Sequence, residues 1–302
     1  MPVDNSRLKG FYKLDVGERR AMIAKLANLN DEQIGALASN GELDDAAADR
    51  MIENVIGTMS LPVGVATNFI LDGKHYVVPF CLEESSVVAA ASNMAKRCHA
   101  SGGFVSNSDG PMMIAQIQLL DIEDHGVAVQ SIEDQKSGLM ALANSLPSTM
   151  IRVGGGCKDI TTRSIESLSG PMLIVHIHVD CLDAMGANAV NTMAELLAPE
   201  LESITNGRSL LRILSNLATQ RLARVSATFT PEEMSNSGDA GEGASIIEGI
   251  LEAHHFAMAD PYRAATHNKG VMNGISAVAV ACGQDWRAVE AGCHAYVAYH
   301  QG

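Results

Sequence analysis

The sequence lacks the features that mark several large classes of protein. It has no run of about 18 uncharged apolar residues, so we expect no membrane span, and its first residues lack the apolar core of a secretory signal. The six cysteines form no CxxC pair, which argues against zinc and disulfide frameworks and favours reduced thiols in a cytoplasm. Basic residues number 21 against 35 acidic ones, and a net charge of −14 argues against wholesale nucleic-acid binding.

Apolar residues are plentiful although aromatic ones are rare. They make up 47% of the 302 residues, with aromatics at 4%, so we expect a core of Ala, Met, Leu, Ile and Val. At about 150 residues per domain, this length predicts two domains. Because the protein repels anions on average, an anionic ligand would have to meet a local group of positive side chains.

The N-terminal part predicts short helices followed by a hairpin. Apolar residues at helical spacing indicate helices at 16–29, 31–37 and 44–55. Strands at 66–71 and 74–80 flank Asp72-Gly73, the dipeptide best suited to a two-residue hairpin turn. An Ala-rich helix is expected at 85–99.

The order of elements after residue 111 identifies a motif. The expected elements are strand 112–120, helix 128–144, a strand around Ile160, strand 172–179, helix 184–204 and strand 210–214. This β-α-β-β-α-β order is that of a split βαβ, ferredoxin-like unit. We therefore predict an α+β fold in which a small domain, 107–216, is inserted into a large mixed helical and sheet domain made of 1–106 and 217–302.

The C-terminal part mixes apolar and polar segments. We expect a strand at 222–229, a Gly/Ser loop at 235–243, a helix at 244–258, a polar loop at 260–270, a strand or buried helix at 275–282 and a last helix at 286–299.

Polar side chains gather in three segments, 83–86, 260–273 and 283–286. The paired carboxylates Glu83 and Glu84 at a helix start are most often solvated dipole partners, whereas a buried one would be a proton donor. The second segment, with Arg263 and Lys269, fits either an anionic or carbonyl ligand or an ordinary surface loop. Asp285 is explained by an N-cap alone.

Other motifs carry little weight. Gly154-Gly155-Gly156 matches neither the dinucleotide fingerprint nor the P-loop, so a tight turn is expected. His176 and His178 alternate along a strand without a Cys or Glu to complete a ligand set, so we expect sheet-face histidines and no metal site.

Several blocks, in order, resemble one family. They are Glu53-Asn-Val-Ile-Gly-Thr58, Pro62-Val-Gly-Val-Ala66, Glu83-Glu-Ser-Ser-Val-Val-Ala-Ala-Ala-Ser92, Asp183-Ala-Met-Gly-Ala-Asn188, Asp260-Pro-Tyr-Arg-Ala-Ala-Thr-His-Asn-Lys269 and Gly283-Gln-Asp-Trp-Arg-Ala-Val-Glu-Ala-Gly292. Together they resemble the class II, soluble prokaryotic 3-hydroxy-3-methylglutaryl-coenzyme A reductases. The similarity runs from the first helix to about Tyr296.

The resemblance implies an oxidoreductase of the mevalonate pathway, which serves isoprenoid biosynthesis. Such an enzyme uses two NAD(P)H to reduce 3-hydroxy-3-methylglutaryl-CoA, through a hemithioacetal and an aldehyde, to mevalonate and CoA, or runs the reverse reaction. It also implies a homodimer with sites at the subunit interface, and a small domain that binds the nicotinamide nucleotide without a Rossmann fold.

Site residues follow from the matching motifs. By resemblance, Lys269 would polarise the thioester carbonyl, Asp285 would hold that ammonium, and Glu84 would donate a proton in the aldehyde step. The substrate acyl group would be held by Ser86, Arg263 and Asn273. The nucleotide pocket would be lined by Asp183, Met185, Gly186, Asn188 and Asn216.

The chain departs from the family pattern at several places. The residue after the Glu pair is commonly Pro, and here it is Ser85. The segment 145–148 has no acidic residue to accept from a ribose 2′-hydroxyl, so the cofactor is NADH or NADPH with NADPH favoured, and Arg152 or Lys158 would meet its 2′-phosphate. Near Tyr12, where the family meets the CoA phosphates, basic residues are adjacent.

After Tyr296 the family pattern continues to a flap helix with a catalytic His that protonates the CoA thiolate. Residues 297–302 lack that context, so His300 is not assigned the role and the large domain is expected to be incomplete. Loss of such an acid slows thiolate departure by about 10² to 10⁴. The alternative hypothesis is therefore a catalytically impaired, truncated homologue that binds nucleotide or acyl-CoA.

Overall fold

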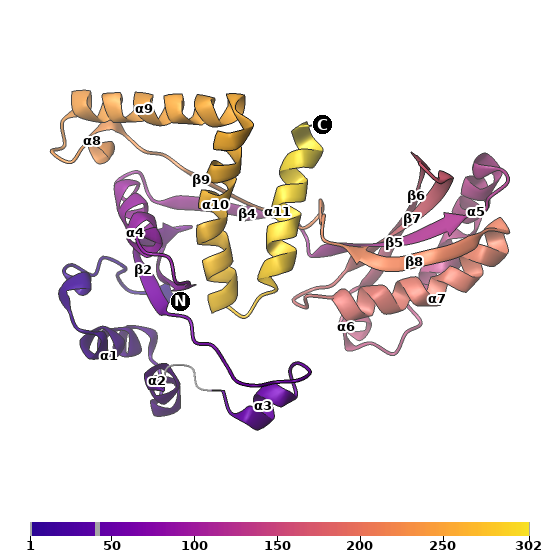
Figure 1. Cartoon of the computed structure of the whole chain (residues 1–302), viewed down its shortest axis with the longest axis horizontal. Helices are drawn as coiled ribbons and strands as arrows, with labels where there is room; N and C mark the ends of the chain where they lie inside the picture. The colour runs from indigo at the N-terminus through magenta and orange to yellow at the C-terminus, as the bar shows by residue number, and fades with distance from the viewer. Residues whose placement is uncertain (1, 40–42, 302) are drawn as a thin grey trace. The chain divides into compact units, whose positions relative to one another are not determined.

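The chain forms two compact units in the computed structural model, which describes residues 2–39 and 43–301, with side chains up to residue 299. The first unit comprises Met1–Ser106 and Val225–Glu290, and the second Asn107–Arg224 and Ala291–Gly302. The described residues form one five-stranded and one four-stranded sheet together with helices, which confirms the predicted α+β class (Figure 1). By contacts, 217–224 and 291–302 group with the second unit.

The five-stranded sheet has the order β1-β3-β2-β4-β9. Its strands are β1 (Pro2–Val3), β2 (Val63–Leu71), β3 (Lys74–Cys81), β4 (Phe104–Ser108) and β9 (Ala223–Ala227). The helices of the first unit are η1 (Phe11–Lys13), α1 (Val16–Ala27), α2 (Asp31–Ala38), α3 (Asp45–Asp49), α4 (Val87–Arg97), α8 (Pro231–Met234), α9 (Ala240–Ala259) and α10 (Pro261–Ala281). The last helix, α11 (Trp286–Gln301), begins in the first unit and ends in the second.

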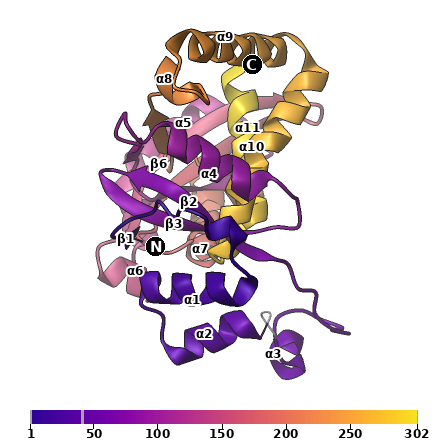
Figure 2. The same ribbon diagram turned by 90° about the vertical axis from the view of Figure 1, so that its left-hand side faces the viewer.

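The β2–β3 hairpin turns at the predicted dipeptide. Asp72 and Gly73 have φ angles of 51° and 76°, the positive values that a two-residue hairpin turn requires. The pairing shifts register between Ala66 and Phe69, which marks a β-bulge. Helix α4 lies across this hairpin (Figure 2).

The bulge is the point where α4 is fixed. Its Thr67 N–H donates to Ser92 Oγ of α4 at 3.0 Å, and Asn68 Nδ2 donates to the Ser92 carbonyl at 2.9 Å. The Asn68 N–H donates to the Ser6 carbonyl at 2.9 Å, which ties the N-terminal segment to the same place. Amides that the bulge frees from the strand ladder thereby anchor two other segments.

The predicted polar loop at 260–270 is wrong, because these residues form the first half of α10. Asp260 is its N-cap and accepts from Arg263 N–H at 2.9 Å, and Pro261 occupies the first turn, where its missing N–H costs nothing. In the second half of α10, the apolar side chains of Met272, Ala277 and Ala279 are buried. Of the strand or buried helix predicted at 275–282, the helix is correct, and it is the end of α10.

Smaller corrections concern element ends. Helix α2 starts at Asp31 as predicted, after the N-cap Asn30, which forms a capping box with Gln33, and it ends one residue later than predicted, at Ala38. Helix α3 ends at Asp49 instead of reaching residue 55. Helix α9 starts at Ala240, inside the predicted Gly/Ser loop, after the N-cap Asp239.

The second unit contains the split βαβ topology. Its elements are β5 (Met112–Leu120), α5 (His125–Ala143), α6 (Thr149–Arg152), β6 (Gly156–Ser167), β7 (Gly170–Asp180), α7 (Ala187–Thr205) and β8 (Arg208–Ser215). The sheet order is β6-β7-β5-β8 with every pair antiparallel. Strand β7 thus separates the first two strands of the unit, as the ferredoxin-like prediction requires.

The larger core lies between this sheet and α5 and α7. Inward residues of β5 and β7, such as Ile117 and Val175, pack against Ile132, Met193 and Leu197 of the helices, all nearly fully buried. Aliphatic and Met side chains form this core, as predicted. In the described part of the chain, no helix has the length and apolar character needed to cross a membrane.

Gly243 is required where α9 meets α8. A Cβ there would lie 1.6 Å from the Pro231 carbonyl oxygen, whereas one at Gly249 of the same helix would meet nothing within 4 Å. We predict that Gly243→Ala lowers the free energy of unfolding by about 1–3 kcal/mol, since the backbone must move. The control Gly249→Ala should raise it by up to about 1 kcal/mol. Urea unfolding measures both, and a Gly243→Ala protein as stable as the wild type would contradict this packing.

The cysteines differ sharply in reactivity. Burial raises the pKa of the Cys157 thiol to about 11 and also raises those of Cys98 and Cys181, while Cys282 is exposed. Because the thiolate is the nucleophile, we predict that iodoacetamide near pH 8 labels Cys282 first and the three buried thiols only after denaturation. Peptide mapping by mass spectrometry measures the rates, with a denatured sample as control. Equal rates for Cys157 and Cys282 in the folded protein would contradict the prediction.

Candidate functional site

Three predicted site residues meet in the first unit, although up to 189 residues separate them. The ammonium of Lys269 lies 2.5 Å from Glu84 Oε2, and Asn273 Nδ2 donates to Glu84 Oε1 at 3.3 Å. The side chains of Lys269 and Glu84 are 60% and 45% exposed, so the pair is open to a ligand. An ion pair this exposed contributes little to stability, and its interest is chemical.

The segments that carry these residues share one support: Glu84 lies in the loop just before α4, and Lys269 and Asn273 lie on α10. Helix α4 packs on β2 and α10 on β3, so both lie on the β2–β3 hairpin. A small cluster of Ala66 and Phe80 from the strands and Ala277 from α10 joins them. Lys269 and Asn273 are one turn apart on α10, which aims both at Glu84.

The other predicted substrate residues take separate positions in the same unit. Ser86, two residues after Glu84, is the N-cap of α4 with φ 72°; it is exposed and its side chain makes no capping hydrogen bond. Arg263 is in the first turn of α10. Asp285 accepts from Ala288 N–H at 3.1 Å and lies 3.9 Å from Arg287. Among the described residues, the only ion pair of Lys269 is with Glu84. The side chain of His300 lies outside the described part.

Four of the five predicted nucleotide residues, Asp183, Met185, Gly186 and Asn188, lie at or just before the start of α7 in the second unit. Gly186 is the N-cap at φ 92°, and a Cβ there would lie 2.3 Å from Cys181 Sγ, so only glycine fits. No side chain caps this 19-residue helix, which leaves the N–H groups of its first turn for a ligand. The backbone at Met185 is fixed by Arg221, whose guanidinium donates to the Met185 carbonyl at 3.2 Å.

A pocket of about 600 Å³ adjoins this loop. Asp183 and Arg221 line it, together with Asp109, whose carboxylate is paired with Arg224 at 2.7 Å. Asn188 follows in the first turn of α7, and Asn216 comes directly after β8. Both side chains are exposed. The pocket therefore has carboxylates and the guanidinium of Arg221 in its lining.

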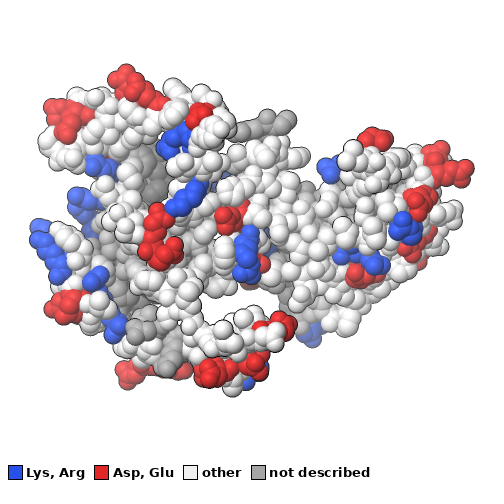
Figure 3. All heavy atoms as spheres, viewed as in Figure 1, with Lys and Arg blue, Asp and Glu red and all other residues white. Residues whose placement is uncertain are grey.

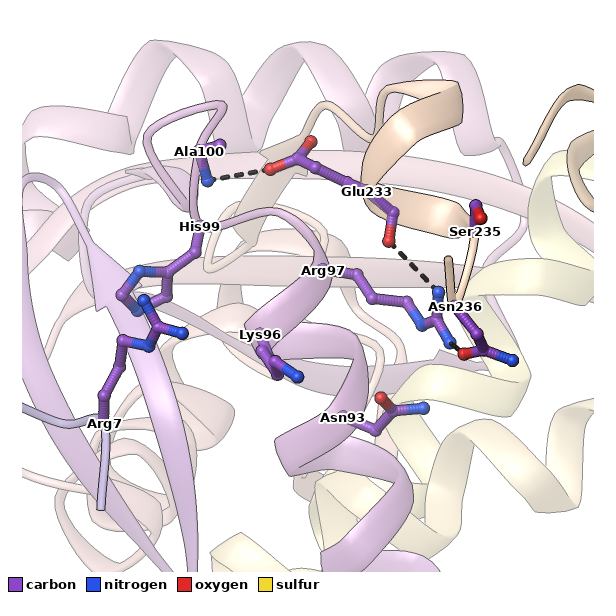
Figure 4. Close-up of a pocket in the computed structure, with 9 residues that line it drawn as sticks. All are labelled: Arg7, Asn93, Lys96, Arg97, His99, Ala100, Glu233, Ser235 and Asn236. Atoms are coloured by element: carbon purple, nitrogen blue, oxygen red, sulfur yellow. Dashed lines mark hydrogen bonds between the residues drawn. The ribbon is translucent and has the colours of Figure 1, made fainter. Parts of the chain in front are cut away.

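A second hollow, of about 400 Å³, lies at the C-terminal end of α4 (Figure 4). Its charged and polar lining residues are Arg7, Asn93, Lys96, Arg97, His99, Glu233, Ser235 and Asn236. Three permanent cations thus face one carboxylate in a protein of net charge −14. On the face in Figure 3, Lys and Arg side chains gather at the left of the view, around the N-terminal segment and α4.

Glu233 and Arg97 clasp α4 to α8 at this hollow. The Glu233 carboxylate accepts from Ala100 N–H at 2.7 Å and from Ser101 Oγ at 2.7 Å. Arg97 donates in return to the carbonyls of Glu233 and Met234. Burial raises the pKa of Glu233, but the hydrogen bonds outweigh it and the pKa is lowered. Glu233 and Arg97 are therefore both engaged in hydrogen bonds between α4 and α8. Arg7 and Lys96, in contrast, form no ion pair among the described residues.

Sequence reasoning missed this hollow. Lys96 and Arg97 end a helix, where basic residues are expected from the helix dipole alone. Arg7 and Glu233 reach them from distant segments of the chain, so no local pattern could have revealed the group. Tyr12, near the family's expected phosphate contact, is 78% exposed with Lys13 over its ring.

The paired histidines of β7 are sheet-face residues. His176 hydrogen-bonds Gln116 at 3.0 Å, and His178 is held between Thr161 and Gln220. Across the described part of the chain, no three His, Cys, Asp or Glu side chains are placed to hold a metal ion.

Known proteins match the chain over nearly its whole length. A family model described as Hydroxymethylglutaryl-coenzyme A reductase matches residues 15–301. The 3-hydroxy-3-methylglutaryl-coenzyme A reductase of Archaeoglobus fulgidus is 51% identical over 97% of this chain and 66% of its own length. The probable enzyme of Borreliella burgdorferi is 33% identical over 82% and 55%. The chain therefore spans about half to two thirds of these relatives.

Solved structures agree with the sequence comparison. The class II 3-hydroxy-3-methylglutaryl-CoA reductase of Streptococcus pneumoniae, bound to NADPH in open conformations, superposes with a TM-score of 0.91 at 41% identity, covering 95% of this chain and 77% of that one. Another structure of the Streptococcus pneumoniae reductase gives 0.92 at 40% identity, over 97% and 69%. The chain belongs to the hydroxymethylglutaryl-coenzyme A reductase family, as its motifs predicted.

Proposed function

We propose that the protein is a 3-hydroxy-3-methylglutaryl-CoA reductase that reduces the thioester with two NAD(P)H to mevalonate and CoA, or catalyses the reverse reaction. The observation that carries the proposal is the Glu84–Lys269–Asn273 group, formed by the family motifs and open to solvent. It places an ammonium, a carboxyl and an amide within one substrate's reach. That combination suits the reduction of a carbonyl.

Lys269 carries the electrostatic part of the chemistry. Its ammonium, directed to the thioester oxygen, stabilises the oxyanion that forms as hydride arrives at carbon. The same contact holds the aldehyde oxygen in the second reduction. Asp285, at the start of α11, would hold this ammonium charged.

Glu84 serves as the proton donor. Its carboxylate accepts from Lys269 at 2.5 Å, so an oxygen held by Lys269 would lie within reach of a proton that Glu84 delivers. Asn273 fixes the other carboxyl oxygen and orients the donor. Ser86 and Arg263 would bind the acyl part of the substrate, Arg263 through its carboxylate.

The second unit is suited to hold the nucleotide. The uncapped first turn of α7 offers N–H groups to a diphosphate, and the glycine at its N-cap lets the backbone approach closely. Asp183, Met185, Gly186, Asn188 and Asn216 would line this site. When bound, NAD(P)H supplies hydride. We assign 107–216 to nucleotide binding and 1–106 with 217–302 to substrate binding.

The cationic hollow would take the phosphate end of the acyl-CoA. Helix α4 follows Glu84 closely, with Ser86 as its N-cap, and has Lys96 in its last turn. At 1.5 Å per residue its 11 residues span about 16 Å. A ligand with a thioester at one end and phosphates at the other can lie along it, with Arg7 and Lys96 free to meet the negative charge.

The proposal extends to assembly and location. We infer a homodimer from the family resemblance, and a cytoplasmic enzyme from the free cysteines. No nucleic-acid or membrane partner is proposed.

Replacing Lys269 tests the assigned chemistry. We predict that Lys269→Ala lowers kcat at least 10²- to 10³-fold, because one oxyanion donor is lost. The fold should persist, since the side chain is 60% exposed. NAD(P)H oxidation with the acyl-CoA measures activity, and circular dichroism measures the fold. Lys25→Ala, an exposed lysine on α1, is the matched control. Retained activity in Lys269→Ala would refute its role, and no turnover by the wild type beside measurable nucleotide binding would refute the reductase.

The cofactor preference can be assigned to two exposed cations. Arg152 of α6 donates to Thr149 Oγ1 at 2.9 Å, and Lys158 of β6 donates to the Gly154 carbonyl at 2.8 Å. We predict a lower KM for NADPH than for NADH, and a rise of about tenfold or more in the NADPH KM in the Arg152→Ala/Lys158→Ala double variant with the NADH KM unchanged. Arg208→Ala, on β8, is the control. Parallel changes in both KM values would exclude a 2′-phosphate contact.

A further inference from the structure

One histidine in the hollow at the end of α4 has an unused ring nitrogen. His99 lines the hollow beside Arg7 (Figure 4). Its Nε2 is buried and has no hydrogen-bond partner among the described residues. Buried polar atoms without a partner are rare and call for an explanation.

The charges around His99 come from every segment packed against it. Arg7 approaches from the N-terminal segment, and His75 of β3 lies 5.8 Å away between ring centroids. Lys96 and Arg97 come from the last turn of α4, just before His99 in the chain. The only carboxylate lining the hollow is that of Glu233, which accepts hydrogen bonds from Ala100 and Ser101. The imidazole therefore faces mainly positive neighbours.

These surroundings favour the neutral form of the ring in the free protein. Burial lowers the pKa of His99 first, and the charges of Arg7 and His75 lower it further. A hydrogen bond with the Asn68 backbone and the charge of Glu233 oppose the shift and are smaller. A neutral ring explains how Nε2 remains without a partner beside Arg7.

We propose that an anionic ligand enters this hollow together with one proton, which His99 takes from solvent onto Nε2. The inference rests on the proposed acyl-CoA substrate, whose phosphates would be that anion. Negative charge near Arg7 reverses the sign of the field at the ring. The new N–H gains a partner, and the imidazolium adds a cation to the group formed by Arg7 and Lys96.

Coupling to the protonation of His99 makes the affinity for the anion depend on pH. Below the lowered pKa of the free protein, His99 is already charged and its contribution to affinity is constant. As pH rises from there to the higher pKa of the complex, binding requires proton uptake, so affinity falls. Above the pKa of the complex the ring is neutral in both states and the contribution is lost.

Calorimetric titration of CoA into the full chain tests the inference. At about pH 6 and pH 8, titrations in two buffers of different ionisation enthalpy give the number of protons taken up. Because a phosphate monoester itself titrates near pH 6, each value is compared with that of His99→Gln, which keeps polarity and cannot be protonated. His125→Gln, in the second unit, is the matched control.

We expect the wild type and His125→Gln to take up as much as one proton more than His99→Gln. Their advantage in affinity over His99→Gln should be about tenfold larger at pH 6 than at pH 8, one pKa unit of coupling. Equal proton uptake in the wild type and His99→Gln, or no binding of CoA to the wild type, would overturn the inference.

The two proposals fail separately. If the protein is an active reductase but His99→Gln binds CoA with the same proton uptake as the wild type, only the proposed proton coupling is refuted. Proton-linked CoA binding without any turnover would remove only the reductase.

Discussion

The position of α4 on the β2–β3 hairpin is the constraint on which the first unit depends. It is set by Ser92, whose hydroxyl accepts from Thr67 and whose carbonyl accepts from Asn68. A regular strand would have used the Thr67 N–H in the sheet ladder, so the bulge is what makes this attachment possible. The loop that leads into α4 then holds Glu84, and the C-terminal end of the same helix lines the cationic hollow.

Positive side chains are grouped locally although the protein as a whole is negatively charged. The protein carries −14, yet Arg7, Lys96 and Arg97 line one hollow and Lys269 meets Glu84 elsewhere in the same unit. Arg97 donates its hydrogen bonds to backbone carbonyls of α8, so Arg7 and Lys96 are the cations available to a ligand. Local grouping of this kind lets an acidic protein bind anions without a basic surface.

The nucleotide site proposed for the second unit has no glycine-rich fingerprint. The unit's antiparallel split βαβ sheet ends in a loop whose single glycine, Gly186, starts a 19-residue helix with no side-chain cap. The unsatisfied amides of such a helix start are an anion site in themselves. The absence of the Rossmann motif from the sequence therefore argued against one fold and not against nucleotide binding.

The sequence alone determined features that depend on neighbours along the chain: the Asp72-Gly73 turn, the order of strands and helices from β5 to β8, and the motifs that identify the family. It failed at α10, where the Asp260-Pro261 start signal was outweighed by the polar residues that follow, and helix formation there is decided by the burial of Met272 and its neighbours. Only the tertiary structure brought Lys269 to Glu84, 185 residues apart, and Arg7 to His99. Such contacts depend on packing across the hairpin, which no local periodicity encodes.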